Sequence, residues 1–128
     1  MELAVDCYEL SSDLPPEEKF GFASQIRRSA TSVPANIAEG FGRWSPRDFA
    51  RFLSIASGSL RELEAHLLVA ARLQYLPPDS LSHVLESISA TAAKLYRLRQ
   101  KVVAERREIR TLAGSSEAKI SLRLVSDR

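Results

Sequence analysis

The sequence predicts an all-α protein, an antiparallel up-and-down four-helix bundle whose second helix is kinked. Apolar residues recur at steps of three and four through most of the chain, which is typical of amphipathic helices. Turns that contain proline or glycine separate four such stretches, at residues 2–12, 17–41, 46–74 and 80–110. Because only a few residues join successive stretches, neighbouring helices should run antiparallel.

Length and composition fit one globular domain. The chain has 128 residues, of which 45% are hydrophobic and 27% charged, and these values favour a real core over wholesale disorder. We expect a bundle domain at 1–110 and a C-terminal tail at 111–128, because Gly114-Ser115-Ser116 interrupts the helical pattern. Residues 119–125 alternate like a strand that has no partner, so the tail should be held loosely or used between subunits.

Several kinds of location and chemistry are disfavoured by the sequence. No apolar segment approaches the roughly 20 residues that span a bilayer, and the N-terminus lacks the pattern of a signal peptide. Cys7 is the only cysteine, so it cannot form an intrachain disulfide, and no histidine close in sequence could activate it as a nucleophile. We expect a cytoplasmic protein with no membrane partner.

Residues 25–43 hold the least ordinary pattern in the chain. A row of polar residues accompanies the apolar stripe at helical spacing, namely Gln25, Ser29, Ser32, Asn36, Glu39 and Arg43. Pro34 lies inside this helix, where it removes one backbone hydrogen bond and predicts a kink. The hydroxyls of Ser29, Thr31 and Ser32 are expected to bond the freed carbonyls. We expect Asn36 and Glu39 to be largely buried and hydrogen-bonded to the third helix or to the kinked backbone, in a structural rather than a catalytic role.

The ends of the second helix and the start of the third carry local signals. Pro15-Pro16-Glu17-Glu18 predicts the start of the second helix, and Gly40 and Gly42 predict its end through left-handed backbone. Ser45 is the expected N-cap of the third helix, with Pro46 at its first position and Asp48 in the capping-box place. Trp44 and Phe49 fall at the positions of a hydrophobic staple.

The third helix combines small and polar residues in its middle. Gly58 costs about 1 kcal/mol relative to alanine in a helix, so another backbone, from the same or a neighbouring subunit, is expected to approach it closely. Ser59, Glu62 and His66 form a polar series in which Glu62 and His66 can pair. A metal site would need a third ligand, and none is found at ligand spacing. Glu39 and Glu62 could act as acid and base, but no nucleophile or cofactor motif accompanies them.

Two runs of the sequence form a specific combined pattern, QIRRSATSVPANIAEGFGR at 25–43 and FLSIASGSLRELEAHLLVA at 52–70. They resemble the bacterial four-helix-bundle proteins, also called 23S rRNA intervening-sequence proteins, over residues 8–110. We expect a structural motif made of Ser32, Pro34, Asn36, Glu39, Gly40, Gly58, Ser59 and Glu62, of which all but Pro34 are among the residues that carry the resemblance. The resemblance implies a homopentamer without enzyme activity or cofactor, related to accessory proteins of diversity-generating retroelements that bind nucleic acid and a reverse transcriptase. The chain departs from this family in its short first helix and in Gln74, where a glycine is common.

Three hypotheses for function follow. The first is an oligomeric, non-enzymatic scaffold that binds RNA, DNA or a nucleoprotein partner through Arg27, Arg28, Arg43, Arg47 and Arg51. The second is a protein-docking module whose arginines are only a solvated surface. The third, a small enzyme using the polar row from Gln25 to Arg43, lacks a catalytic motif. Salt-dependent binding of RNA separates the first hypothesis from the second.

Overall fold

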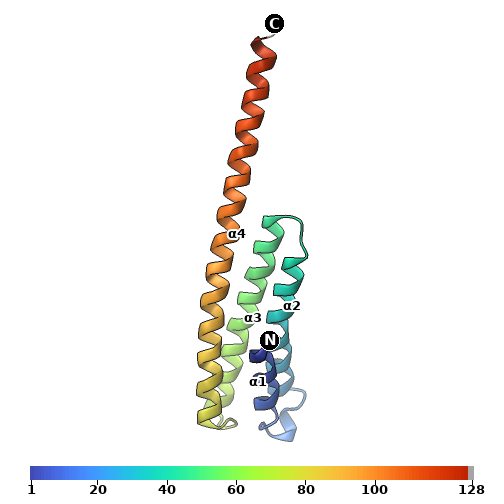
Figure 1. Ribbon diagram of the computed structural model, residues 1–128. Helices are drawn as coiled ribbons and strands as arrows, with labels where there is room; N and C mark the ends of the chain where they lie inside the picture. Colours follow the sequence, from blue (N-terminus) through green and yellow to red (C-terminus); the bar gives the residue numbers. More distant parts are fainter. Residues whose placement is uncertain (127–128) are drawn as a thin grey trace.

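The structure is a computed structural model that describes residues 1–126, and it contains α-helices and one short 3-10 helix but no strand (Figure 1). The elements are α1 (Glu2–Ser11), η1 (Pro16–Glu18), α2 (Phe22–Phe41), α3 (Pro46–Arg72) and α4 (Pro78–Ser126). Helices α2, α3 and α4 lie side by side in alternating directions, and the short α1 packs against α2 and α4. The predicted all-α up-and-down bundle is confirmed.

One apolar cluster to which every α-helix contributes forms the core. Its largest fully buried aliphatic side chains are Ile26 on α2, Leu53, Leu63 and Leu67 on α3, and Ile88 on α4. Removing an aliphatic side chain of this size from water stabilises the fold by about 1.5–3 kcal/mol. The helical spacing of these residues in the sequence is therefore the direct cause of the bundle.

The second helix begins later than predicted. Pro16–Glu18 forms a separate 3-10 turn, and Gly21, with φ −100° and ψ −113°, immediately precedes α2. The carboxylate of Glu18 accepts a hydrogen bond of 3.2 Å from the N–H of Phe22, the first residue of α2. The proline and acidic residues do mark a helix start, but they start a turn that ends before α2 begins.

Helix α2 continues through Pro34, and its hydroxyls have other partners than predicted. Ser29 and Thr31 donate to carbonyls one turn before them, at 2.7 and 2.9 Å. Pro34 removes the helical donor for the carbonyl of Ala30. A serine or threonine hydroxyl bonds a carbonyl three or four residues before it, so Ser29 and Thr31 lie too early in the helix to reach Ala30. The hydroxyl of Ser32 contacts α3 instead. The predicted rescue of the freed carbonyl is wrong.

The glycines at the end of α2 have a steric role. No glycine among residues 1–126 has a positive φ, and Gly42 caps α2 with a right-handed backbone, so the predicted left-handed stop is wrong. Gly40 is buried, and a Cβ added there would lie 2.8 Å from Cδ2 of Phe49 and 3.1 Å from Cβ of Phe52. Glycine at position 40 therefore lets α2 approach α3 closely at their common end.

The C-terminal end of α3 places a strained residue at the following turn. Gln74 has φ 61°, in the left-handed region where side chains other than glycine are disfavoured. The N–H of Tyr75 donates to the carbonyl of Ala70 at 3.0 Å, and the N–H of Gln74 donates to Ala71 at 2.9 Å. These two bonds make a Schellman motif, which requires the left-handed backbone at position 74.

The last helix is much longer than predicted. We expected it to end near Arg110, but α4 continues to Ser126. Gly114 and the serines after it cost roughly 1 kcal/mol or less each in a helix, and without a proline they do not end one. Val102 is the last buried residue among those described, and α4 projects well beyond the bundle from there (Figure 1). Residues 127 and 128, the end of the predicted tail, lie outside the described residues.

Candidate nucleic-acid interface

The turn between α2 and α3 brings three of the predicted arginines together. Ser45 caps α3 as predicted, since its Oγ accepts a hydrogen bond of 3.2 Å from the N–H of Asp48. This cap fixes the first turn of α3, so Arg47 and Arg51, four residues apart, lie on one face of it. Arg43 lies just before the turn, after the end of α2. We call Arg43, Arg47 and Arg51 the turn arginines.

The ring of Phe52 holds two of the turn arginines in place. The guanidinium groups of Arg43 and Arg51 lie over the ring of Phe52, at 4.7 and 4.6 Å from its centroid. Arg43 also forms an ion pair of 2.6 Å with Glu39, and Arg51 lies 3.7 Å from a carboxylate oxygen of Asp48. Cation–π contacts of this kind contribute about 0.5–1 kcal/mol at exposed sites. The two guanidinium groups are therefore positioned before any ligand arrives.

Arg47 differs from the other turn arginines. It is exposed in the first turn of α3, and within residues 1–126 it makes no ion pair. The N-terminus of a helix carries a partial positive charge, so Arg47 adds to a positive potential that already exists there. This combination favours the binding of an anion such as a phosphate.

Arg106 on α4 adds a positive charge at the end of the bundle where the turn arginines lie. The sequence pattern did not predict it as part of the interface. Arg99 on α4 donates a hydrogen bond of 2.9 Å to the hydroxyl of Ser54 on α3. Helices α3 and α4 run antiparallel with the same rise per residue. Arg47 lies seven residues before Ser54, and Arg106 lies seven residues after Arg99, so Arg47 and Arg106 lie at about the same level. Arg106 is half-buried and follows the buried Val102 by one turn, so it lies on the face of α4 toward α3.

Arg27 and Arg28 lie far from the turn arginines. At 1.5 Å per residue they are about 20 Å from the end of α2 at Phe41, and Arg43 lies beyond that end. Arg27 stacks on the ring of Tyr8 at 5.0 Å and donates to the hydroxyl of Ser11 at 2.7 Å, which ties α2 to α1. Arg28 donates to Gln25 and forms an ion pair with Glu62 on α3. The structure therefore divides the five predicted arginines into two groups.

A polar network joins the middle of α2 to α3. The hydroxyls of Ser32 and Ser59 are 2.8 Å apart, and Asn36 is half-buried and donates to the carbonyl and the hydroxyl of Ser32 at 2.8 and 3.0 Å. The predicted hydrogen bond from Asn36 to the helix backbone is confirmed. The predicted burial of Glu39 is wrong, because its side chain is 56% exposed and pairs with Arg43 instead.

Glu62 is the centre of a second polar group. It accepts hydrogen bonds from Arg28 and, as predicted, from His66, whose Nε2 lies 3.3 Å from Oε1 of Glu62. Desolvation alone would raise the pKa of Glu62, but the hydrogen bonds and charges of His66 and Arg28 outweigh it and hold that pKa below its usual value. Glu62 is thus a structural anion that joins α2 to α3.

Comparison with known proteins gives the same family as the sequence pattern. Residues 1–97 match the 23S rRNA-intervening sequence protein family. The chain belongs to this family. A solved structure, a protein of unknown function from the S23 ribosomal protein family of Bacteroides thetaiotaomicron VPI-5482, is 30% identical to this chain. That similarity covers 77% of this chain and 92% of the other, with a TM-score of 0.71, whereas no curated protein matches.

The matched region of the family ends inside α4, before Arg99 and Arg106. The projecting part of α4 is therefore a feature of this chain outside the match. The turn arginines lie within the match, and Arg106 lies outside it. The candidate interface therefore combines residues inside and outside the region that matches the family.

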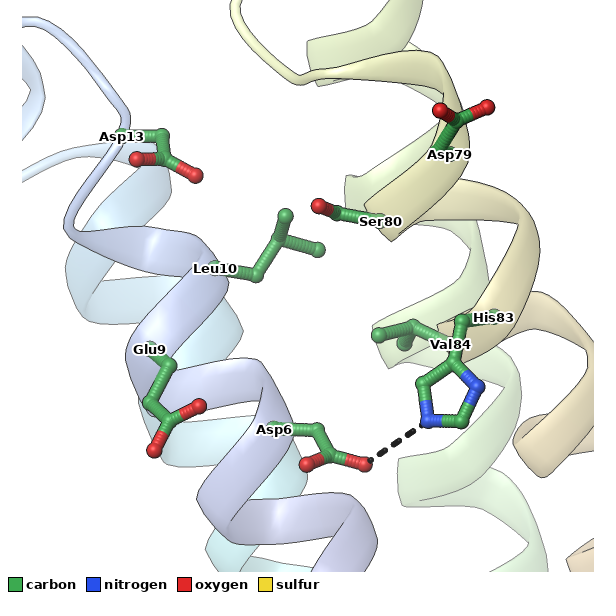
Figure 2. Close-up of a pocket in the computed structure, with 8 residues that line it drawn as sticks. All are labelled: Asp6, Glu9, Leu10, Asp13, Asp79, Ser80, His83 and Val84. Atoms are coloured by element: carbon green, nitrogen blue, oxygen red, sulfur yellow. Dashed lines mark ion pairs between the residues drawn. The ribbon is translucent and has the colours of Figure 1, made fainter.

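An acidic cleft lies at the opposite end of this family member, between α1 and the start of α4 (Figure 2). It has a volume of about 410 Å³, with Leu10 and Val84 in its lining and Asp6, Glu9 and Asp79 among its acidic groups. His83 lies 3.5 Å from Asp6 across the cleft. Because carboxylates repel phosphates, this end disfavours nucleic acid. The bundle thus has acidic groups at one end and the turn arginines at the other.

The groups that could react or hold a metal give no support for catalysis. Burial raises the pKa of Cys7 to about 12, with a smaller contribution from Asp6, so the thiol is uncharged at neutral pH. Among residues 1–126, no cluster of three histidine, cysteine or acidic side chains could hold a metal ion. None of the helices in the described part combines the length and apolar composition needed to cross a bilayer.

Proposed function

We propose that this family member is a non-enzymatic homo-oligomer that binds nucleic acid, alone or in a nucleoprotein, at the end of the bundle formed by the turn between α2 and α3. The observation that carries the proposal is Arg47, a cation at a helix N-terminus that makes no ion pair within residues 1–126. It lies between the other turn arginines in the sequence, and the register of α3 and α4 places it level with Arg106. Guanidinium groups bind phosphate oxygens in pairs of hydrogen bonds, so this end suits a phosphate backbone.

RNA is the nucleic acid to test first. Both family descriptions name ribosomal components, the 23S rRNA in one and the S23 ribosomal protein in the other. Contacts to phosphates carry no sequence information, so the turn arginines should bind RNA of different sequences with similar affinity. The acidic cleft at the other end favours one orientation of the protein on a polyanion.

Arg27 and Arg28 have a smaller part in the proposal. Both use hydrogen bonds within the chain, to Ser11 and to Glu62, and these bonds would weaken if the guanidinium groups turned to a phosphate. Their first role in this account is to join α2 to its neighbours. We expect Arg27 and Arg28 to contact nucleic acid only if an oligomer places them beside nucleic acid that is bound by another copy.

The test is a double charge reversal, Arg47→Glu with Arg51→Glu, compared with Arg61→Glu and Arg72→Glu at exposed positions of α3 away from the turn. RNA affinity is measured by fluorescence anisotropy of a labelled oligonucleotide, on protein whose oligomeric mass is unchanged. The turn variant should bind at least about tenfold more weakly because two phosphate contacts are lost, and the control should bind nearly as well as the native protein. Equal affinity of both variants would contradict the proposed surface.

The assembly is proposed to be a homopentamer formed through α3. A stripe of exposed apolar and small residues runs along this helix, namely Ile55, Gly58, Ala65 and Val69. Their spacings are three, seven and four residues, and Glu62 occupies the helical position between Gly58 and Ala65. Such spacing is typical of a helix that packs against another helix. Apart from the adjacent residues and the nearby backbone of α3 itself, no atom of the described residues lies within 4 Å of a Cβ added at Gly58, so the expected close approach does not come from this part of the same subunit. A neighbouring copy would explain a glycine that otherwise costs about 1 kcal/mol.

Light scattering tests the assembly at micromolar concentration. The expected mass is five times the 14.2 kDa of one chain, and Gly58→Ala should lower it by forcing the neighbouring helix away. Gly114→Ala, on the exposed projecting part of α4, is the matched control and should leave the mass unchanged. A single-chain mass for the native protein would remove the proposal. A pentamer that binds no RNA at low salt would favour the protein-docking alternative.

A further inference from the structure

Trp44 is completely exposed at the tip of the turn between α2 and α3. Its relative exposure is 103%, the highest among the large apolar residues of the described chain. The predicted staple between Trp44 and Phe49 is wrong, because the ring of Phe49 pairs with that of Phe41, with centroids 4.9 Å apart. Phe49 also fills the space left by the absent side chain of Gly40. The indole of Trp44 therefore has no packing role within the chain.

The surroundings of Trp44 are cationic. Arg43 precedes it directly, Arg47 follows it by three residues, and the position of Arg43 is held by Glu39 and Phe52. Phe41, the last residue of α2 and 65% exposed, provides a second accessible ring near the turn. Proteins that bind single-stranded nucleic acid combine these two features, a positively charged surface that follows the phosphates and exposed aromatic rings on which bases stack.

We infer that Trp44 stacks on an unpaired base of a nucleic acid whose adjacent phosphates contact the turn arginines. The inference rests on the proposed function and adds the strand state of the ligand, which must be single-stranded at this point. Inside a duplex, away from its ends, both faces of a base are covered by its neighbours, so the indole could not reach one without unstacking the helix. Contacts between copies have a separate surface in this account, the apolar stripe of α3.

Trp44 is the only tryptophan in the chain, so intrinsic fluorescence reports on this contact directly. The native oligomer is titrated with an unstructured single-stranded RNA and with a long RNA duplex at the same nucleotide concentration, so that terminal base pairs, which expose one face, are few. Saturation with the single strand should quench the tryptophan emission, and saturation with the duplex should change it much less. Trp44→Ala should weaken binding of the single strand by about 5- to 100-fold, as expected for the loss of one stacked base, with a smaller effect for Trp44→Phe.

Phe20→Ala is the matched control, since Phe20 is an 87% exposed ring beside the ammonium group of Lys19 at the other end of α2. It should leave RNA binding unchanged. Salt-dependent RNA binding without quenching, and with equal affinity for Trp44→Ala, would overturn the inference while the proposed function stands. Failure of the native protein to bind either RNA at low salt would overturn both. A change in oligomeric mass for Trp44→Ala would identify the indole as a contact between copies and overturn the inference.

Discussion

The hydroxyl of Ser32 on α2 lies 2.8 Å from the hydroxyl of Ser59 on α3. This contact and the ion pair of Arg28 with Glu62 are polar links between two helices that also share an apolar core, and Asn36 completes the first by donating to Ser32. A polar contact of this kind stabilises only while each partner is satisfied, because an unpaired polar group away from water is costly.

Replacing Asn36 with leucine should lower the free energy of unfolding by about 1–3 kcal/mol, since the hydroxyl and carbonyl of Ser32 lose a donor. Urea denaturation followed by circular dichroism measures the difference. Ala38→Leu, at an exposed position of the same helix, controls for the added apolar surface and should change stability little. Unchanged stability of Asn36→Leu together with lost RNA binding would instead make Asn36 part of a binding surface.

Glu62 should make stability depend on acid pH. A carboxyl group whose pKa is lowered on folding stabilises the protein above its unfolded pKa of about 4.3, and that contribution is lost as the pH falls through the lower, folded value. Glu62→Gln should therefore reduce stability at pH 7 by at most about 1 kcal/mol, because the side chain is partly exposed, and the difference should decrease as the pH falls below the unfolded pKa.

Denaturation of the Glu62→Gln variant and the native protein at a series of pH values measures this difference. Glu64→Gln, a neighbour with no ion pair in the described chain, is the control and should show no such trend. A difference that persists unchanged at pH 3 would mean that the charge of Glu62 does not stabilise the fold.

Gly40→Ala should destabilise the bundle although alanine is the better helix former. The gain of about 1 kcal/mol from helix propensity is outweighed by the clash with Phe49 and Phe52, so we expect a net loss of about 1–2 kcal/mol. Gly114→Ala, where no atom lies within 4 Å of the new Cβ, should show only the gain. Thermal unfolding measures both variants, and a stabilised Gly40→Ala protein would show that the two rings can move aside.

Gln74→Gly should stabilise the protein. The left-handed backbone at position 74 costs roughly 1 kcal/mol for a residue with a Cβ and nothing for glycine, although the greater freedom of glycine in the unfolded chain offsets part of the gain. We expect a net increase of about 0.5–1 kcal/mol in the free energy of unfolding, measured by urea denaturation. Gln74→Ala keeps the Cβ and should show no increase; an equal increase for both variants would place the cause elsewhere.

The helices and their buried faces could be predicted from the sequence because burial repeats with the helical period. The spacing of Leu53, Leu60 and Leu67 is enough to place one face of α3 in the core. The cap at Ser45 and the pair of Glu62 with His66 could also be predicted, because each depends only on residues three or four apart. Local spacing is the common basis of these correct predictions.

The other features depend on contacts that spacing does not determine. Phe49 could pair with Trp44 or Phe41, and the close approach of α2 and α3 at Gly40 decides for Phe41. Glu39 lies in the polar row but points to Arg43 rather than into the bundle. Arg106 and Arg47 lie at the same level along the bundle because of the register of α3 and α4, and this register cannot be predicted from the sequence.

The salt dependence of RNA affinity tests the central claim, a phosphate-binding surface at the turn arginines, most directly. For the native oligomer and single-stranded RNA, the logarithm of the binding constant should fall linearly with the logarithm of salt concentration. Arg47→Ala should reduce the magnitude of that slope by about 0.7, the value for one lost contact to a single strand, in an oligomer of unchanged mass. A binding constant that does not change with salt, or a slope that Arg47→Ala leaves unchanged, would contradict the account.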